Sequence, residues 1–110
     1  MSKTKPQATQ PPPDNDASAK ARMKARAIAI LSASNPSAMH AAAVRIYADA
    51  FVEYLDAQRN IDTHGAIVFH PRTGAPIENP YTKTRDTASS KMLRIKLRVD
   101  RLWSELAGAP

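Results

Sequence analysis

Basic side chains are the residues of this sequence whose types and spacing could do chemistry. Sixteen Lys and Arg stand against ten Asp and Glu, which gives a formal net charge of +6 and a calculated pI of about 10.0. Seven of these cations lie between Lys83 and Arg101, where Asp86 and Asp100 are the only acids. Because Lys and Arg bind phosphate oxygens, the expected partner is a polyanion, nucleic acid before an anionic membrane.

Two groups of cations compete for the predicted DNA contact. The first group occupies alternate residues of a predicted N-terminal helix, with two weaker contacts in the arm before it: Lys20, Arg22, Lys24, Arg26, Lys3 and Lys5. The second group follows a helical repeat near the C-terminus: Lys91, Arg94, Arg98 and Arg101. For both groups the alternative interpretation is an ordinary solvated helix face. The sequence does not choose between the two groups.

Acidic and imidazole side chains form no pattern that is typical of a catalytic or metal site. Asp49, Glu53 and Asp56 share one helix face, but no histidine lies at a matching spacing, so a solvated acidic face is favoured. The three histidines lack metal-ligand spacing and a paired nucleophile: His40, His64 and His70. The chain has no cysteine and no Gly-rich phosphate loop. We therefore predict no catalytic residue, no metal and no cofactor, and no enzyme activity.

The order of the segments predicts a mainly α fold, with about three helices and a small β-hairpin between the last two. Residues 1–13 form a Pro-rich basic arm that is expected to be disordered, because it has little apolar surface to bury. Residues 14–34 form a basic N-terminal helix whose first half is expected to project into solvent. Residues 35–110 form a helix-hairpin-helix core for oligomerisation.

Capping residues and turns set the boundaries within this core. Asn35-Pro36 is expected to end the first helix and cap the next, which runs from Met39 or Ala43 to Asn60. That helix directs one apolar side to the core, with the residues Val44, Tyr47, Phe51, Tyr54 and Leu55, and its opposite side pairs Arg45 with Asp49. The β-branched run 66–69, turn residues 70–74 and the run 75–78 predict the hairpin, with Pro76 on an edge strand.

The last helix is expected to run without a break from Asn79 to Leu106. Its apolar residues recur in steps of three and four and make one seam: Ala88, Met92, Ile95, Val99, Leu102 and Leu106. Leu93 and Leu97 lie roughly opposite this seam, and we interpret them as a contact with another copy of the chain. The carboxylates of Asp49, Glu53 and Asp56 are expected to meet the basic ridge of a neighbouring copy in the same assembly.

The order of these parts resembles the small terminase subunits of tailed double-stranded DNA bacteriophages. The resemblance rests on Tyr47-Ala48-Asp49-Ala50, on Gly65 and Gly74 around the hairpin, and on Asn79-Pro80 with Lys83 and Arg85-Asp86 after it. It covers roughly residues 38–97. Its most specific piece is the pattern Asn-Pro-x-x-Lys-x-Arg-Asp over residues 79–86.

The resemblance implies a ring-shaped homo-oligomer without enzyme activity of its own. Such a protein binds viral DNA and regulates the large terminase subunit, the motor ATPase and nuclease of genome packaging. A phage protein of this kind acts in the cytoplasm of the infected bacterial host, which agrees with the lack of a membrane-spanning or signal segment in the sequence. The residues alone leave two alternatives, a small dimeric DNA-binding transcriptional regulator and a structural or adaptor protein.

Overall fold

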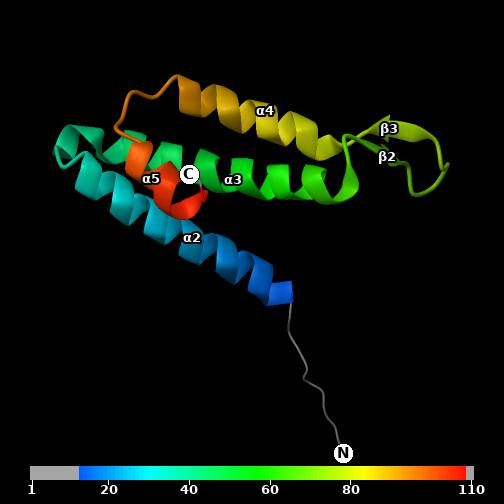
Figure 1. Cartoon of the computed structure of the whole chain (residues 1–110), viewed down its shortest axis with the longest axis horizontal. Helices are drawn as coiled ribbons and strands as arrows, with labels where there is room; N and C mark the ends of the chain where they lie inside the picture. The colour runs from blue at the N-terminus through cyan, green and yellow to red at the C-terminus, as the bar shows by residue number, and fades with distance from the viewer. Residues whose placement is uncertain (1–12, 109–110) are drawn as a thin grey trace, which may run out of the picture.

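A computed structural model describes residues 13–108 as a layer of three helices, with a fourth helix lying across it and a hairpin beyond one end (Figure 1). The elements in chain order are α2 (Pro13–Ser34), the 3-10 helix η1 (Ala38–His40), α3 (Ala41–His64), β2 (Ile67–Phe69), β3 (Pro76–Glu78), α4 (Pro80–Leu93) and α5 (Asp100–Leu106). The mainly helical class and the hairpin are therefore confirmed. Residues 1–12, with Lys3 and Lys5, lie outside the described residues. No helix in the described part is long and apolar enough to cross a membrane.

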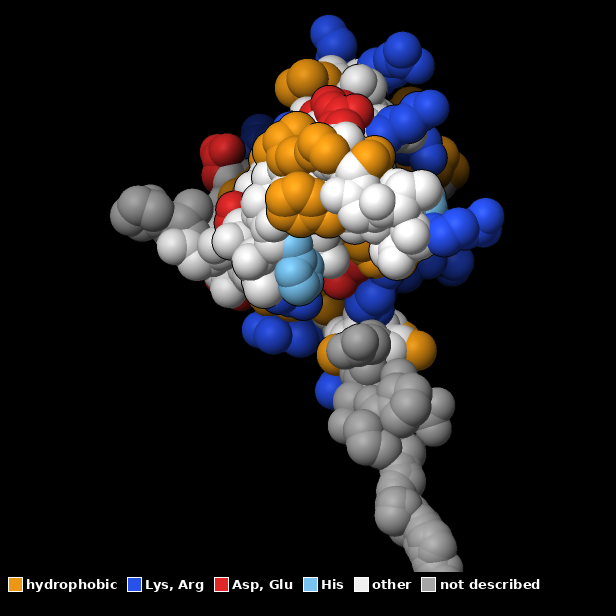
Figure 2. All heavy atoms as spheres, turned by 90° about the vertical axis from the view of Figure 1, so that its right-hand side faces the viewer, with side chains coloured by type: hydrophobic (Ala, Val, Ile, Leu, Met, Phe, Trp, Pro, Cys, Tyr) orange, Lys and Arg blue, Asp and Glu red, His pale blue; other side chains and the backbone are white. Residues whose placement is uncertain are grey.

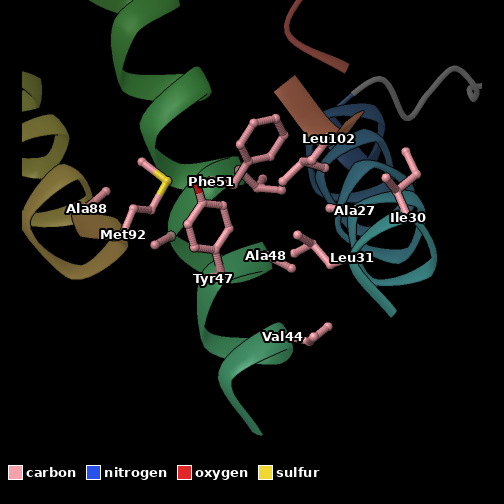
Figure 3. Packing of buried hydrophobic residues seen from close by; sticks show 12 residues of the cluster. Ala27, Ile30, Leu31, Val44, Tyr47, Ala48, Phe51, Ala88, Met92 and Leu102 are labelled. Carbon is pink, nitrogen blue, oxygen red and sulfur yellow. The ribbon is translucent and has the colours of Figure 1, made fainter. Parts of the chain in front are cut away.

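Helix α3 is the centre of the core. Its apolar residues recur at helical spacing, as predicted. Val44, Tyr47 and Phe51 are buried, and Tyr54 and Leu55 are half-buried and pack against the core. Phe51 is fully buried. Figure 3 shows side chains of α3 between Ala88 and Met92 of α4 on one side and those of α2 on the other. The helix ends at His64, four residues later than predicted, where Gly65 adopts a φ of 91°.

The hairpin forms as predicted and stands beyond the ends of α3 and α4 (Figure 1). Its strands pair antiparallel, with Phe69 opposite Pro76 and Ile67 opposite Glu78. The turn closes where Gly74, at a φ of 74°, donates its N–H to the carbonyl of His70 at 2.8 Å. Ile67 and Phe69 remain 59% and 70% exposed, and Figure 2 shows hydrophobic side chains gathered at this end of the molecule.

Asn79 joins the hairpin to both long helices. Its side-chain oxygen accepts the N–H of Tyr81 at 3.0 Å and so caps α4, with Pro80 in the first turn, as predicted. Its amide nitrogen donates to the carbonyl of Gly65 at 2.9 Å and to the side-chain oxygen of Asn60 at 3.0 Å. The Asn79 residue is 2% exposed, and its donor and acceptor atoms are both used. One side chain therefore fixes the end of α3 and the start of α4.

The prediction of one unbroken last helix is wrong. Helix α4 ends at Leu93, residues 94–99 form a non-helical connection, and α5 begins at Asp100. The connection turns the chain back, so that α4 packs on α3 while α5 contacts α2. The seam residues are all buried or half-buried as predicted. They lie on two helices and the connection between them, however, so α4 packs on α3 and α5 contacts α2. Leu97 consequently packs against the core from the connection and does not lie opposite the seam.

The side chain of Asn35 explains the break. Its oxygen accepts the N–H of Arg98 at 2.9 Å, and its nitrogen donates to the carbonyl of Arg98 at 3.0 Å and to that of Leu31 at 2.9 Å. Both backbone groups of Arg98 are therefore used outside a helix. Asn35 was expected to cap the following helix, but Ser37 caps η1 instead, by accepting the N–H of Met39. Asn35 ends α2 as predicted and holds the distant connection as well.

Aromatic contacts fix α5 after the connection. The indole N–H of Trp103 donates to the hydroxyl of Tyr47 at 2.8 Å. The same ring meets Phe51 edge to face, with centroids 4.9 Å apart, and Tyr54 at 5.8 Å. Leu102, fully buried, enters the core beside Phe51 (Figure 3). A short helix of seven residues is thus held by packing and one partly buried hydrogen bond.

Replacing Asn35 by Ala tests its role in bending the chain. The variant loses both hydrogen bonds to Arg98 and leaves partly buried backbone groups unpaired, so the free energy of unfolding should fall by about 2 to 4 kcal/mol. Urea unfolding measures this change, and hydrogen exchange of the Arg98 amide should become faster. Asn35→Asp should not rescue stability, because it keeps the acceptor for the Arg98 N–H but loses the donor.

The matched control for this prediction is Gln58→Ala. Gln58 makes an exposed hydrogen bond to Asp62 at 2.9 Å and accepts a long, partly buried one from Arg85 at 3.4 Å, and their loss should lower the unfolding free energy by less than about 1 kcal/mol. Unchanged stability and unchanged exchange at Arg98 in the Asn35→Ala variant would show that the break has another cause.

Candidate nucleic-acid interface

Two of the four α2 cations predicted to bind DNA are engaged within the chain. The ammonium of Lys20 lies 3.1 Å from a carboxylate oxygen of Glu53 and 3.7 Å from one of Asp56. The ammonium of Lys24 lies 3.0 Å from Asp49. All three carboxylates belong to α3, so α2 is held on α3 by a row of ion pairs as well as by apolar contacts. Each such surface pair contributes little alone, at most about 1 kcal/mol.

The pKa values of two groups reflect this packing. Burial alone lowers the pKa of Lys20, but hydrogen bonding and attraction to Glu53, with a smaller effect of Asp56, outweigh it and raise the pKa above its ordinary value. Burial raises the pKa of Tyr47, and its hydrogen bond with Trp103 opposes the rise only in part. Both groups therefore hold their protons more tightly in the folded chain.

The first half of α2 projects less than predicted. Lys20 contacts α3, and Met23 packs against the core, so docking begins in the first half of the helix. Asp49 also pairs with Lys24, and the predicted pair with Arg45 does not form. The acidic face of α3 meets cations of its own chain, where a neighbouring copy was expected to supply them. Any part of Asp49, Glu53 and Asp56 in an oligomer interface stays a prediction.

The other two α2 cations, Arg22 and Arg26, are exposed. Among the described side chains, those of residues 17–108, neither has a carboxylate oxygen within 4.0 Å, and the same is true of Arg45 on α3. The alternation of the four cations explains the difference, because Lys20 and Lys24 are one helical turn apart and share the face toward α3. The predicted α2 patch is therefore split between an inner ion-paired pair and an outer exposed pair.

The competing patch is also arranged differently from the prediction. Lys91 lies in the last turn of α4, Arg94 caps that helix, Arg98 lies in the connection and Arg101 lies in α5. All four are exposed, but they do not form one helical ridge. Arg101 is paired with Glu105 one turn later. Sequence reasoning omitted Lys96, which lies between Arg94 and Arg98 and is exposed as well.

Two grooves flank α4 on α3. The first groove, about 580 Å³, has Ile46, Ala50 and Ala88 between the carboxylates of α3 and the ammonium groups of Lys83 and Lys91. The second groove, about 420 Å³, is mainly apolar and is closed by the connection and α5. Its lining includes both predicted interface leucines, Leu93 and Leu97. Leu93 is 83% exposed, whereas Leu97 is half-buried. The contact of these leucines with another copy stays a prediction.

The described acidic and imidazole side chains, those of residues 17–108, do not gather into a cluster of three or more that could hold a metal ion. His70 has a local role in the hairpin turn, where its Nδ1 accepts the N–H of Arg72 at 3.1 Å. The chemistry available on this surface is therefore charge, carried by exposed Arg and Lys that are held on a compact helical support.

Comparison with known protein families gives a match to most of the chain. The sequence model of a protein family described as phage terminase, small subunit, matches residues 20–98, which is more than half of the chain. The matched range runs from the ion-paired part of α2 to the connection that Asn35 holds. Neither the curated proteins nor the solved structures contain a match to the chain.

The raised pKa values predict how stability responds to alkaline pH. Folded Lys20 and Tyr47 bind their protons more tightly than the unfolded chain does, so their contribution is complete below about pH 10 and is lost as pH rises further. Urea midpoints measured between pH 8 and pH 11 should therefore fall at the alkaline end. Tyr47→Phe should make the fall shallower. A stability that increases between pH 10 and pH 11 would contradict this assignment.

Proposed function

The chain belongs to the phage terminase small-subunit family, and we propose that it binds viral double-stranded DNA and regulates the large terminase subunit during genome packaging. The family match over residues 20–98 is the observation that carries this proposal. In this role the chain is not itself an enzyme, and it acts beside the motor ATPase and nuclease in the cytoplasm of the infected host. The net charge of +6 supports the DNA-binding part.

The proposed working form is a ring-shaped homo-oligomer. The protomer leaves large apolar side chains in solvent at several places, among them Ile67 and Phe69 on the hairpin and Leu93 on α4. A two-stranded hairpin is marginal alone and is stabilised when another surface covers it. A second copy of the chain supplies such a surface, and repeated head-to-tail contacts close into a ring when the rotation permits.

A ring also accounts for DNA binding without a groove-reading motif. Each phosphate contact of an exposed cation is weak at physiological salt. Copies joined in one assembly present their cations together, so the contacts reinforce one another through effective concentration. Arg and Lys contacts to phosphate position a protein on DNA but do not read its sequence. The proposed binding is therefore sensitive to salt and is carried by the DNA backbone.

The direct test combines the purified chain, duplex DNA and the large subunit of the same phage. The chain should shift a DNA duplex with an affinity that falls as salt rises, and it should change the ATPase rate of the large subunit. Fluorescence anisotropy at several salt concentrations and a coupled ATPase assay measure the two effects. Absence of DNA binding at low salt together with an unchanged ATPase rate would refute the proposed function.

Replacing Leu93 by Asp tests the predicted contact between copies. Light scattering or native mass spectrometry of the wild type should show one discrete multimer, and Leu93→Asp should shift it toward smaller species, because a charge would be buried without a partner. The control is Met39→Asp, because Met39 and Leu93 are both 83% exposed. A Leu93→Asp multimer as large and as stable as that of the wild type would remove Leu93 from the interface.

A further inference from the structure

We propose that the connection between α4 and α5 is a phosphate-binding strap, in which Arg94, Lys96 and Arg98 contact the DNA backbone. The inference rests on the proposed DNA-binding function and goes beyond it by assigning the contact to one segment. It also differs from both predicted patches, because it includes Lys96 and sets aside the ion-paired lysines of α2. We call residues 94–99 the strap.

Burial alternates along the strap. Ile95, Leu97 and Val99 are half-buried and pack against the core, while Arg94, Lys96 and Arg98 between them are exposed. Every second side chain is therefore anchored, and the three cations between the anchors all extend into solvent. Over residues 91–101 there are five Lys or Arg and one Asp, which gives a net charge of +4. Residues 17–27 of α2 carry the same net charge of +4, but two of their four cations, Lys20 and Lys24, are ion-paired.

The backbone of the strap is held before any ligand arrives. Asn35 binds both the N–H and the carbonyl of Arg98, at 2.9 and 3.0 Å, and it belongs to the turn after α2. The start of the strap is held as well, because the N–H groups of Arg94 and Ile95 donate to carbonyls in the last turn of α4, each at 3.2 Å. A segment fixed at both ends loses less conformational entropy on binding than a free loop does.

Ion pairing separates the strap from the two lysines of the α2 patch, whereas Arg22 and Arg26 of that patch are exposed and unpaired among the described residues. Lys20 and Lys24 are engaged by three carboxylates of α3, and DNA would have to displace those partners. Among the described residues, Arg94, Lys96 and Arg98 have no carboxylate oxygen within 4.0 Å. Asp100 follows the strap and is exposed, and Glu105 is taken by Arg101. The strap cations are therefore available to an incoming anion.

The chemistry of the strap favours a nucleic acid over an acidic protein. Protein interfaces are usually built around an apolar centre, whereas protein–DNA interfaces are more polar and strongly positive. The apolar residues of the strap pack half-buried against its own core and line the second groove, whereas the exposed side chains of the strap are its three cations. The strap also lies at the opposite end of the molecule from the hairpin (Figure 1), so copies that associate through the hairpin would leave it open, whereas a contact through Leu93 would border it.

The test compares two triple variants that remove the same charge from exposed positions. One is Arg94→Gln, Lys96→Gln and Arg98→Gln in the strap. The other is Arg45→Gln, Arg72→Gln and Lys83→Gln, whose residues are also exposed and have no carboxylate partner among the described side chains of residues 17–108. Binding of a DNA duplex is measured by anisotropy over a range of salt concentrations, with light scattering and circular dichroism on each protein.

The strap variant should flatten the dependence of log K on log salt by about 2 to 3, because each lost phosphate contact removes about 0.9 from the slope. The control variant should keep the slope of the wild type, and both should keep its helicity and multimer. Equal slopes in the strap variant and the wild type, or a flattened slope in the control alone, would overturn the assignment.

Two further outcomes would also count against the strap, and a third would count against the proposed function. Dispersal of the multimer by the strap variant would make it a contact between copies. Unchanged DNA binding with lost stimulation of the large subunit would make it a docking surface for protein. If the wild type itself binds no DNA at low salt, then the proposed function fails, and that result is distinct from a failure of the strap alone.

Discussion

The hydrogen bonds between the side chain of Asn35 and the backbone of Arg98 are the constraint on which the arrangement of this chain depends. They join residues that are 63 positions apart, and they occupy backbone groups that a continuous helix would use internally. Because of them the C-terminal segment folds back, Leu102 and Trp103 reach the core, and α5 contacts α2. Asn79 makes a comparable junction at the other end of α3. These two buried asparagines hold a small core that has few aromatic residues.

The same constraint divides the cations of the chain into two kinds. On α2, Lys20 and Lys24 face α3 and stabilise the fold by pairing with its carboxylates. After α4, the bend turns the apolar residues of the strap inward, so Arg94, Lys96 and Arg98 extend outward without such partners. Some of the cations in the sequence are thus engaged in ion pairs within the chain, and others are exposed and can bind an anion. The proposed function draws on the available part, multiplied by the copies in the proposed ring.

Local signals predicted the elements well, and tertiary contacts limited the rest. Asn79-Pro80 predicted the start of a helix, and the turn residues around Gly74 predicted the hairpin. Both predictions succeeded because capping and turn formation depend on residues close together in the sequence. The unbroken last helix was wrong because residues 94–99 satisfy two patterns: the seam spacing is helical, while basic and apolar residues alternate strictly, with a period of two. The partner that decided between them, Asn35, lies far away in sequence. The ion pair between Lys20 and Glu53 could not be predicted either, because it depends on how α2 packs on α3 and no short sequence pattern gives that packing.

Lysine footprinting of the wild-type chain, with and without duplex DNA, tests the central claim most directly. Acetylation read by mass spectrometry reports each lysine separately. The account predicts that Lys96 reacts readily in the free protein and is protected by DNA, while Lys20 and Lys24 react slowly with or without DNA. Protection of Lys20 and Lys24 by DNA, with Lys96 unaffected, would contradict the account.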